Sequence, residues 1–427
     1  MSHSSTIART ARLPVLGRCV LVASFLVIVL DGYLAWSQPK EYSKEALTML
    51  RKLKIDGWGD ADEQGNALRV RMLEPSDDRL AELVQAFPKL EMIYLSWRDD
   101  GVPTVSPVGL RHIERLPALK ILWLLDASFT DQRAEVVSRL TNLKDLYIIP
   151  GSLTVRGIAS LSHLKSLESL TVTLGFEERK RAFDGQGQAD DAMGVALLRT
   201  FPQLKRLALS GPGVSSLTMR ELGTLTHLES LSMNYPLKIT AADFRHVRNL
   251  TRLQEMLFGA HITDDWLAHL APLKSLKRIE FSRDVTDAGM AHLSSLTNVE
   301  ALRIANEKIT DKSLAALQSM TKLQSLELFS PKITGSGLVH LGQLQQLHRL
   351  NLPRTGIQPE HVHHLARLTA LKTLDVSGTP LNQGDNWKSL GVLKDLKHLE
   401  VIEIELSLGT TRALEKMLPG RRIYYID

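Results

Sequence analysis

Apolar residues recur along the chain in one short pattern, L-T-x-L-x-x-L-x-L, followed by a turn and I-T-D-x-x-L-x-x-L. The first residue of each L-x-L pair marks the repeat. From Leu207 to Leu374 successive marks are 24, 25, 23, 23, 24, 24 and 24 residues apart. A fixed period of this length indicates an array of stacked repeats. The marks are Leu68, Ile93, Leu122, Leu146, Leu170, Leu207, Leu231, Met256, Ile279, Leu302, Leu326, Leu350, Leu374, Ile402 and Ile423.

Each repeat contains two periodicities. Around a mark, apolar residues alternate with others, as at 302–304, which predicts a short half-buried strand. Downstream the apolar spacing widens, as from Met290 to Leu293, which is typical of a short helix. Thr286 precedes that stripe and can cap the helix, and Asp287 complements its dipole. One such unit cannot bury its apolar side alone, so the units are expected to stack.

These repeats resemble the leucine-rich repeat superfamily, which is ribonuclease-inhibitor-like, and in particular its short T-D-containing subtype common in bacterial cell-envelope proteins. The resemblance covers about residues 44–427 and is most specific over 204–376. It implies an α/β fold, a right-handed horseshoe-shaped solenoid with a parallel concave sheet and convex helices. The usual Asn or Cys after the strand is mostly absent, so a continuous asparagine ladder is not expected. The residues near that place are Gly259, Ser282, Ala305, Phe329 and Pro353.

The two ends of the array differ from its middle. An amphipathic helix at 43–54 and a strand at 67–73 are expected to cap the N-terminal end, as the family often has. A helix, a Pro-Gly break and a last strand are expected to close the other end. The expected divisions are an N-terminal signal anchor or signal peptide (1–37), an N-terminal cap (38–73), the leucine-rich repeat array (74–400) and a C-terminal cap (401–427).

The N-terminal segment has the composition of a membrane-targeting sequence. Arg9, Arg12 and Arg18 precede an uninterrupted apolar run at 19–30. Three interpretations stay open: an uncleaved transmembrane anchor helix that contacts the membrane through residues 13–36, a signal peptide cleaved near 35–37, and a soluble cytosolic tail. The arginines favour an N-terminus inside and repeats outside. The expected location is therefore the cell envelope, with the repeats extracytoplasmic and membrane-anchored or exported.

Composition excludes several classes of function. The only cysteine, Cys19, lies in the apolar run, so the repeats are expected to contain no disulfide. The net charge is +5, and three of the basic residues lie in the first 37. What remains is no electrostatic footprint for nucleic acid, and we expect no nucleic-acid partner.

The concave face is where a partner is expected, because the residues flanking each L-x-L pair point there. The first repeats place apolar side chains at these positions, where later repeats place charges. An exposed apolar patch rich in Trp and Tyr is typical of an interaction site. The alternative is that the N-terminal cap or the loop at 101–109 covers this patch, which would then be ordinary core. The predicted partner-binding residues are Tyr94, Trp97, Trp123, Tyr147, Arg278, Glu280, Arg303, Glu327 and Arg349.

No residue pattern indicates catalysis, a cofactor or a purposeful metal site. His361 and His364 could share a helix face, but structural zinc would need four well-spaced ligands. The insertion at 175–189 is a second candidate for binding or a tolerated loop without a role. We therefore expect a non-enzymatic recognition or scaffold protein of the cell envelope that binds an unidentified protein or a glycan. The alternatives are a self-associating structural component of the envelope and an adaptor-type leucine-rich repeat receptor.

Overall fold

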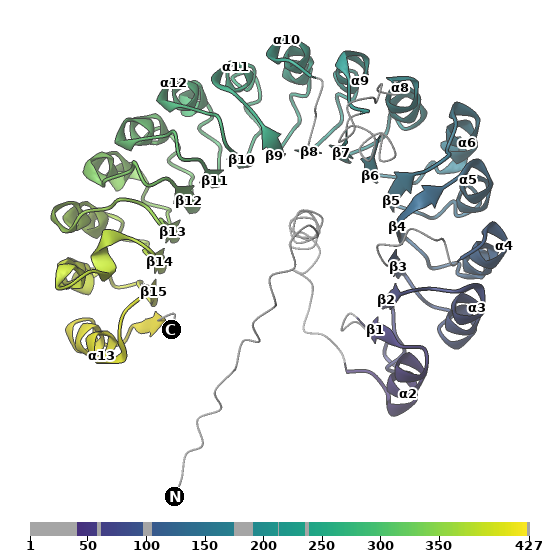
Figure 1. Cartoon of the computed structure of the whole chain (residues 1–427), viewed down its shortest axis with the longest axis horizontal. Coiled ribbons are helices and arrows are strands. Elements are labelled where there is room, and N and C mark those ends of the chain that lie inside the picture. The colour runs from purple at the N-terminus through teal and green to yellow at the C-terminus, as the bar shows by residue number, and fades with distance from the viewer. Residues whose placement is uncertain are drawn as a thin grey trace, which may run out of the picture.

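The computed structural model describes residues 41–57, 61–96, 105–174, 191–211, 213–234 and 239–424. Strands follow the inner side of an arc, and helices cover its outer side (Figure 1). Within the described residues, the strands form one 16-stranded sheet whose spatial order follows the sequence from β1 to β16. From β2 onward every neighbouring pair is parallel. This confirms the predicted α/β solenoid with a parallel concave sheet and convex helices.

The strands are short and evenly distributed. They are β1 (Ile55–Gly57), β2 (Arg69–Leu73), β3 (Met92–Ser96), β4 (Ile121–Phe129), β5 (Asp145–Pro150), β6 (Ser169–Thr173), β7 (Arg206–Ser210), β8 (Ser230–Asn234), β9 (Glu255–His261), β10 (Arg278–Ser282), β11 (Ala301–Ala305), β12 (Ser325–Phe329), β13 (Arg349–Asn351), β14 (Thr373–Asp375), β15 (Val401–Glu403) and β16 (Arg422–Tyr424).

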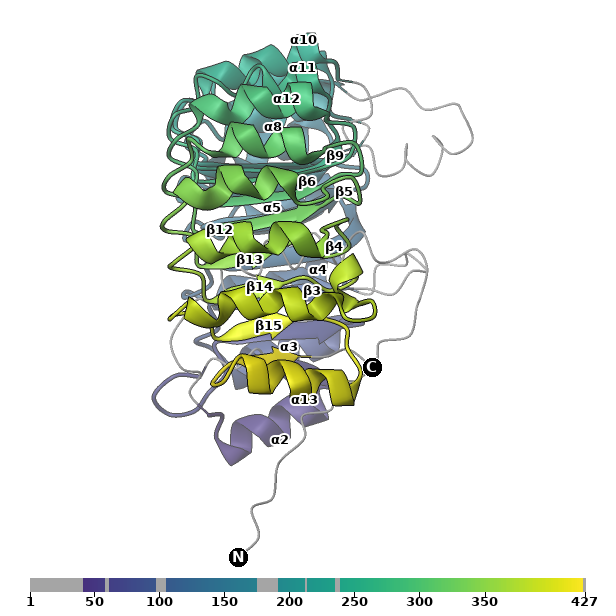
Figure 2. The same ribbon diagram turned by 90° about the vertical axis from the view of Figure 1, so that its left-hand side faces the viewer.

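The convex helices of successive coils lie one above another (Figure 2). The α-helices are α2 (Lys44–Lys52), α3 (Asp77–Ala86), α4 (Pro107–Leu110), α5 (Asp131–Val137), α6 (Val155–Ser160), α8 (Asp191–Thr200), α9 (Ser216–Leu222), α10 (Ala241–Phe244), α11 (Asp264–Leu267), α12 (Asp287–Ala291) and α13 (Leu408–Met417). The 3₁₀ helices are η1 (Arg111–Arg115), η2 (Leu161–His163), η3 (Arg245–Asn249), η4 (His292–Ser295), η5 (Asp311–Leu317), η6 (Ser336–Gln343), η7 (Pro359–Arg367), η8 (Pro380–Asn382) and η9 (Asn386–Asp395).

The repeat register predicted from the sequence is confirmed from the second mark onward. Leu326 lies opposite Leu302 on one side and Leu350 on the other, and all three are buried. The first mark was wrong, because Val70 rather than Leu68 pairs with Ile93. Residues two apart in a strand share a face, so alternation alone does not distinguish these two positions.

One apolar cluster runs through the described residues from Ala46 in α2 to Ile423 in β16. It lies between the sheet and the convex helices, and each coil adds its own leucines to it. Because neighbouring coils share this core, no single coil is stable alone, and the stacking of the coils holds the array together.

Backbone hydrogen bonds join the coils at the rim where the strands begin. The carbonyl oxygen of Lys277 accepts N–H groups of Glu300 at 2.7 Å and of Ala301 at 2.9 Å. The carbonyl oxygen of Glu300 accepts those of Gln324 and Ser325 at 2.7 and 3.0 Å. This arrangement repeats along the array and satisfies the backbone polar groups where each chain segment enters the sheet.

The T-D motif joins neighbouring coils on the convex side. Thr286 caps α12 by accepting the N–H of Ala288 at 3.2 Å. Its hydroxyl and its own N–H also donate to the carboxylate of Asp264 in the preceding coil, at 2.6 and 2.7 Å. Thr310 makes the same pair of bonds to Asp287, at 2.7 and 2.8 Å. The sequence predicted the cap and the favourable dipole, whereas this link between coils was not foreseen.

Acid should weaken these links. Burial raises the pKa of Asp287, but hydrogen bonds from Ser313 and Thr310 outweigh burial and hold the pKa below its ordinary value of 3.8. The pKa of Asp311 is lowered in the same way, with Thr334 donating. A carboxyl whose pKa is lowered by folding stabilises the folded state above its unfolded pKa, and this contribution is lost as pH falls through the folded pKa. The free energy of unfolding should therefore fall from about pH 4 downward.

The variant Asp287→Asn tests this contribution. At neutral pH it should cost about 1–3 kcal/mol, because it removes a charged acceptor of several hydrogen bonds. Chemical unfolding measures the free energy of unfolding of variant and parent, and the difference between the two should become smaller as pH falls below about 4. A difference that stays constant with pH would show that the Asp287 charge contributes nothing.

The ends of the described array contain the expected elements. Ser43 caps α2 by accepting the N–H of Ala46 at 3.1 Å, and α13 and β16 lie where the sequence predicted a last helix and strand. The antiparallel pairing of β1 with β2 was not predicted.

The predicted leader and the insertion at 175–189 lie outside the described residues. None of the helices in the described ranges has the length and apolar character needed to cross a membrane.

Candidate functional site

In each strand from β2 to β15, the residue between the two buried apolar residues of the repeat lies opposite its counterpart in the next strand. These residues form one row across the concave face. We call this row the midline. It passes from aromatic side chains on β3–β5, through small side chains on β6–β8, to side chains from β10 onward that are charged except for Asn351. Its members are Arg71, Tyr94, Trp123, Tyr147, Thr171, Ala208, Ser232, Leu257, Glu280, Arg303, Glu327, Asn351, Asp375 and Glu403.

The aromatic cluster, Met92, Tyr94, Trp123 and Tyr147, is a second apolar cluster separate from the main core. The rings of Tyr94 and Trp123 meet edge to face with centroids 6.0 Å apart, and those of Trp123 and Tyr147 do so at 6.5 Å. The indole N–H of Trp123 donates to Oδ1 of Asp145 at 2.7 Å. The four residues are thus a packed unit held by ring contacts and a hydrogen bond.

The exposure expected for this cluster was wrong. Tyr94, Trp123 and Tyr147 are only 3, 2 and 7% exposed, so they do not form an open apolar patch. Strands in register bring the rings edge to face, and each ring covers part of its neighbour. Burial raises the pKa of Tyr147 to about 12. These facts favour the alternative of packed interior residues, while a role in partner binding stays a prediction. Trp97 lies outside the described residues.

Small side chains follow the aromatic cluster on the midline, at Thr171, Ala208 and Ser232. Beside them, an open recess of about 400 Å³ lies where β7–β11 begin. Sequence reasoning did not identify it, because its walls are Ala301 and ordinary polar residues at the strand starts. The lining side chains are Arg206, Glu229, Ser230, Gln254, Glu255, Lys277, Arg278, Glu300 and Ala301.

The charged row is built around Arg303 of β11. Its Nη1 lies 2.6 Å from Oε1 of Glu280, and its Nε lies 2.8 Å from Oε1 of Glu327. Arg278 lies 3.8 Å from the other oxygen of Glu280. The side chain of Arg303 is 49% exposed, so this network is open to a partner. The structure thus brings together four of the predicted charged residues, Arg278, Glu280, Arg303 and Glu327.

The fifth predicted charge, Arg349, lies further along the concave face and faces carboxylates. It starts β13, whereas Asp375 and Glu403 lie opposite each other on β14 and β15. Burial and the neighbouring charge of Asp375 raise the pKa of Glu403, and Arg349 opposes this. The concave face therefore changes from alternating charges at β10–β12 to mostly acidic side chains at β14 and β15.

Three histidines lie close together in η7. His361 and His364 stack with ring centroids 6.3 Å apart, so they share a helix face as the sequence indicated. Burial and the neighbouring His363 lower the pKa of His364. Across the described ranges, no group of three or more His, Cys, Asp or Glu side chains is arranged to hold a metal ion.

Comparisons with known proteins give no family assignment. No protein-family model matches the chain, and no curated protein matches it. Among solved structures, an internalin (inlF) from Listeria monocytogenes str. 4b F2365 is 18% identical, with 84% of this chain and 93% of that chain covered and a TM-score of 0.47. The Leptospira interrogans LRR protein LIC12759 is 17% identical, with 90% and 100% covered and a TM-score of 0.49. TLR13, solved as a complex with ssRNA13, is 16% identical, with 79% and 57% covered and a TM-score of 0.47.

Proposed function

We propose that this protein is a non-catalytic recognition protein that binds a protein partner on the charged half of its concave face. The observation that carries the proposal is the position of Arg303. It lies on the midline, half exposed, and is held by carboxylates from both neighbouring strands. Since β10, β11 and β12 are joined by continuous backbone pairing, these charges are fixed in place before any partner arrives.

Fixed charges of alternating sign make binding selective for a partner with the complementary charge pattern. They accelerate encounter with a complementary partner and disfavour partners with the wrong charge pattern. The recess at the starts of β7–β11 adjoins this surface and offers a place for a protruding partner side chain. In this proposal the aromatic cluster stiffens the neighbouring strands, and Trp97 stays a predicted contact. The location of the protein in the cell envelope is proposed from residues 13–36 alone.

Reversing the charge of Arg303 should weaken partner binding without unfolding the protein. We expect Arg303→Glu to raise the dissociation constant about tenfold or more, because two like charges would then face the new carboxylate. Ion pairs between exposed side chains contribute only about 0–1 kcal/mol to stability. Glu280 is 12% exposed and would face a like charge, so the melting temperature should fall while the protein stays folded. Isothermal titration calorimetry with the purified partner measures the first effect, and circular dichroism measures the second.

Arg156→Glu is the matched control, because it makes the same charge change at an exposed position of the convex helix α6. This control should bind the partner as the parent protein does. If both variants weakened partner binding equally, the affinity would depend on the net charge of the protein and not on the concave surface.

A further inference from the structure

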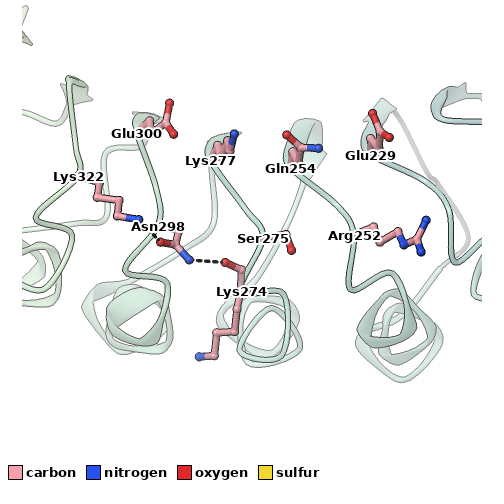
Figure 3. Close-up of a pocket in the computed structure, with 9 residues that line it drawn as sticks. All are labelled: Glu229, Arg252, Gln254, Lys274, Ser275, Lys277, Asn298, Glu300 and Lys322. Carbon is pink, nitrogen blue, oxygen red and sulfur yellow. Dashed lines mark hydrogen bonds between the residues drawn. The ribbon is translucent and has the colours of Figure 1, made fainter.

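A second recess, of about 430 Å³, lies on the rim outside the concave face, between the starts of β8–β11 and the convex helices (Figure 3). Two rows of side chains face each other across it. The strand-side row consists of residues that immediately precede strands: Glu229, Gln254, Lys277 and Glu300. The helix-side row consists of Arg252, Ser275, Asn298 and Lys322.

The framework of this rim recess is fixed by hydrogen bonds between coils. The carbonyl oxygen of Glu229 accepts the N–H groups of Gln254 and Glu255 at 2.7 and 3.0 Å. In the helix-side row, Asn298 donates to the carbonyl oxygen of Lys274 at 2.9 Å, and its own amide oxygen accepts Nζ of Lys322 at 2.8 Å. The side chains therefore project from a backbone that is already held in place.

Two of the lysines at the position of Lys277 in other coils are neutralised by a glutamate of the preceding coil. Nζ of Lys120 lies 2.7 Å from Glu91, and Nζ of Lys205 lies 3.3 Å from Glu168. The coil before Lys277 presents Gln254 at this position instead. Within the described ranges, Lys277 forms no ion pair.

The rim recess as a whole has more positive charge than its own carboxylates balance. Three cations point toward it, Arg252, Lys277 and Lys322, together with two carboxylates, Glu229 and Glu300. The side chain of Lys274 points away from the recess, and its Nζ donates to the carbonyl oxygen of Ser295 at 2.9 Å (Figure 3). No ion pair among the described residues joins these carboxylates to Arg252 or Lys277. Lys322 is bonded to a neutral amide, so its charge is uncompensated too.

We propose that the rim recess binds an extended acidic peptide segment, whose carboxylates pair with Arg252, Lys277 and Lys322. The strand-side row crosses four coils, with one residue before each of β8–β11. With neighbouring strands about 4.8 Å apart, it spans roughly 14 Å, the length of about four extended residues. Gln254 and Ser275 line the same recess and form no side-chain hydrogen bond among the described residues, so they are available to the peptide backbone. This site shares no side chain with the charged row around Arg303, whereas Glu229, Gln254, Lys277 and Glu300 also line the recess at the starts of β7–β11.

A fluorescein-labelled octaglutamate peptide tests the proposal by fluorescence anisotropy with the full-length protein. We expect saturable binding that weakens as salt is raised, since exposed charges are screened. The double variant Arg252→Gln, Lys277→Gln should lose at least fivefold in affinity. Both side chains are exposed, so circular dichroism should show the parent's melting temperature.

Lys144→Gln is the matched control. Lys144 is an exposed lysine at the same rim position as Lys277, has no carboxylate partner among the described residues and lies outside the rim recess. This variant and Arg303→Glu should bind octaglutamate with an affinity within twofold of the parent. The rim-recess proposal can therefore fail while the proposal for the charged row around Arg303 stands, and the reverse. Equal loss with Lys144→Gln, binding of octalysine as tight as of octaglutamate, or tighter binding of an oligogalacturonate would each overturn the proposal.

Discussion

Leu326→Ala should lower the free energy of unfolding by about 2–5 kcal/mol, because it opens a cavity in a close-packed core. Leu326 is fully buried and lies in register between Leu302 and Leu350. Those two leucines have the same surroundings one coil away, so Leu302→Ala and Leu350→Ala should cost similar amounts. Urea unfolding followed by circular dichroism measures all three.

Leu217→Ala is the control for apolar truncation, because Leu217 in α9 is 52% exposed. It should cost well under about 1 kcal/mol, as exposed positions usually do. In a solenoid each coil contacts only its neighbours, so a core truncation can also split the unfolding into two steps. No loss at two of the three core positions would contradict the repeat register.

Trp123→Ala should be as damaging as a core truncation, with a loss of about 3–5 kcal/mol in the free energy of unfolding. The change removes a 2%-exposed indole that packs against Tyr94 and Tyr147. It also removes a hydrogen bond to the buried carboxylate of Asp145. The sequence alone left two interpretations of Trp123 open, a partner-binding residue on an exposed patch and a residue of the ordinary core.

Two further variants separate packing from polar effects. Trp123→Phe keeps an aromatic ring and loses only the indole N–H, so it should cost less than Trp123→Ala. Arg303→Ala lies on the same midline but is half exposed, and should cost about 1 kcal/mol or less. If Trp123→Ala kept the parent's stability and weakened partner binding, this prediction would be wrong. The aromatic cluster would then be an open docking patch.

The parts of the fold that follow from local periodicity could be predicted. The marks from Ile93 to Ile423 pair in register, because each leucine must face the same core. The first mark failed by two residues, since Leu68 and Val70 share a strand face. The T-D link between coils was missed because it depends on which threonine lies beside which aspartate, as Thr286 does beside Asp264.

The site was harder to predict than the fold. Alternation shows that the side chains of Trp123 and Arg303 both point to the concave face, away from the main core. How far each is buried there depends on the side chains of the neighbouring strands. Next to Trp123 stand two more rings, and next to Arg303 stand two carboxylates. The two recesses formed from residues such as Gln254 and Lys277, which have no distinctive type or local motif.

The central claim, that partners dock on the charged half of the concave face, is most directly tested by site-specific photocrosslinking. A photoreactive amino acid would replace Arg303, Glu327 or Arg349 on the concave face, and Val155, Leu217 or Val339 on the convex helices. The concave positions should yield a crosslinked partner of one size, and the convex positions should yield none. Crosslinking to that partner from the convex positions, with none from positions 303, 327 and 349, would contradict the account.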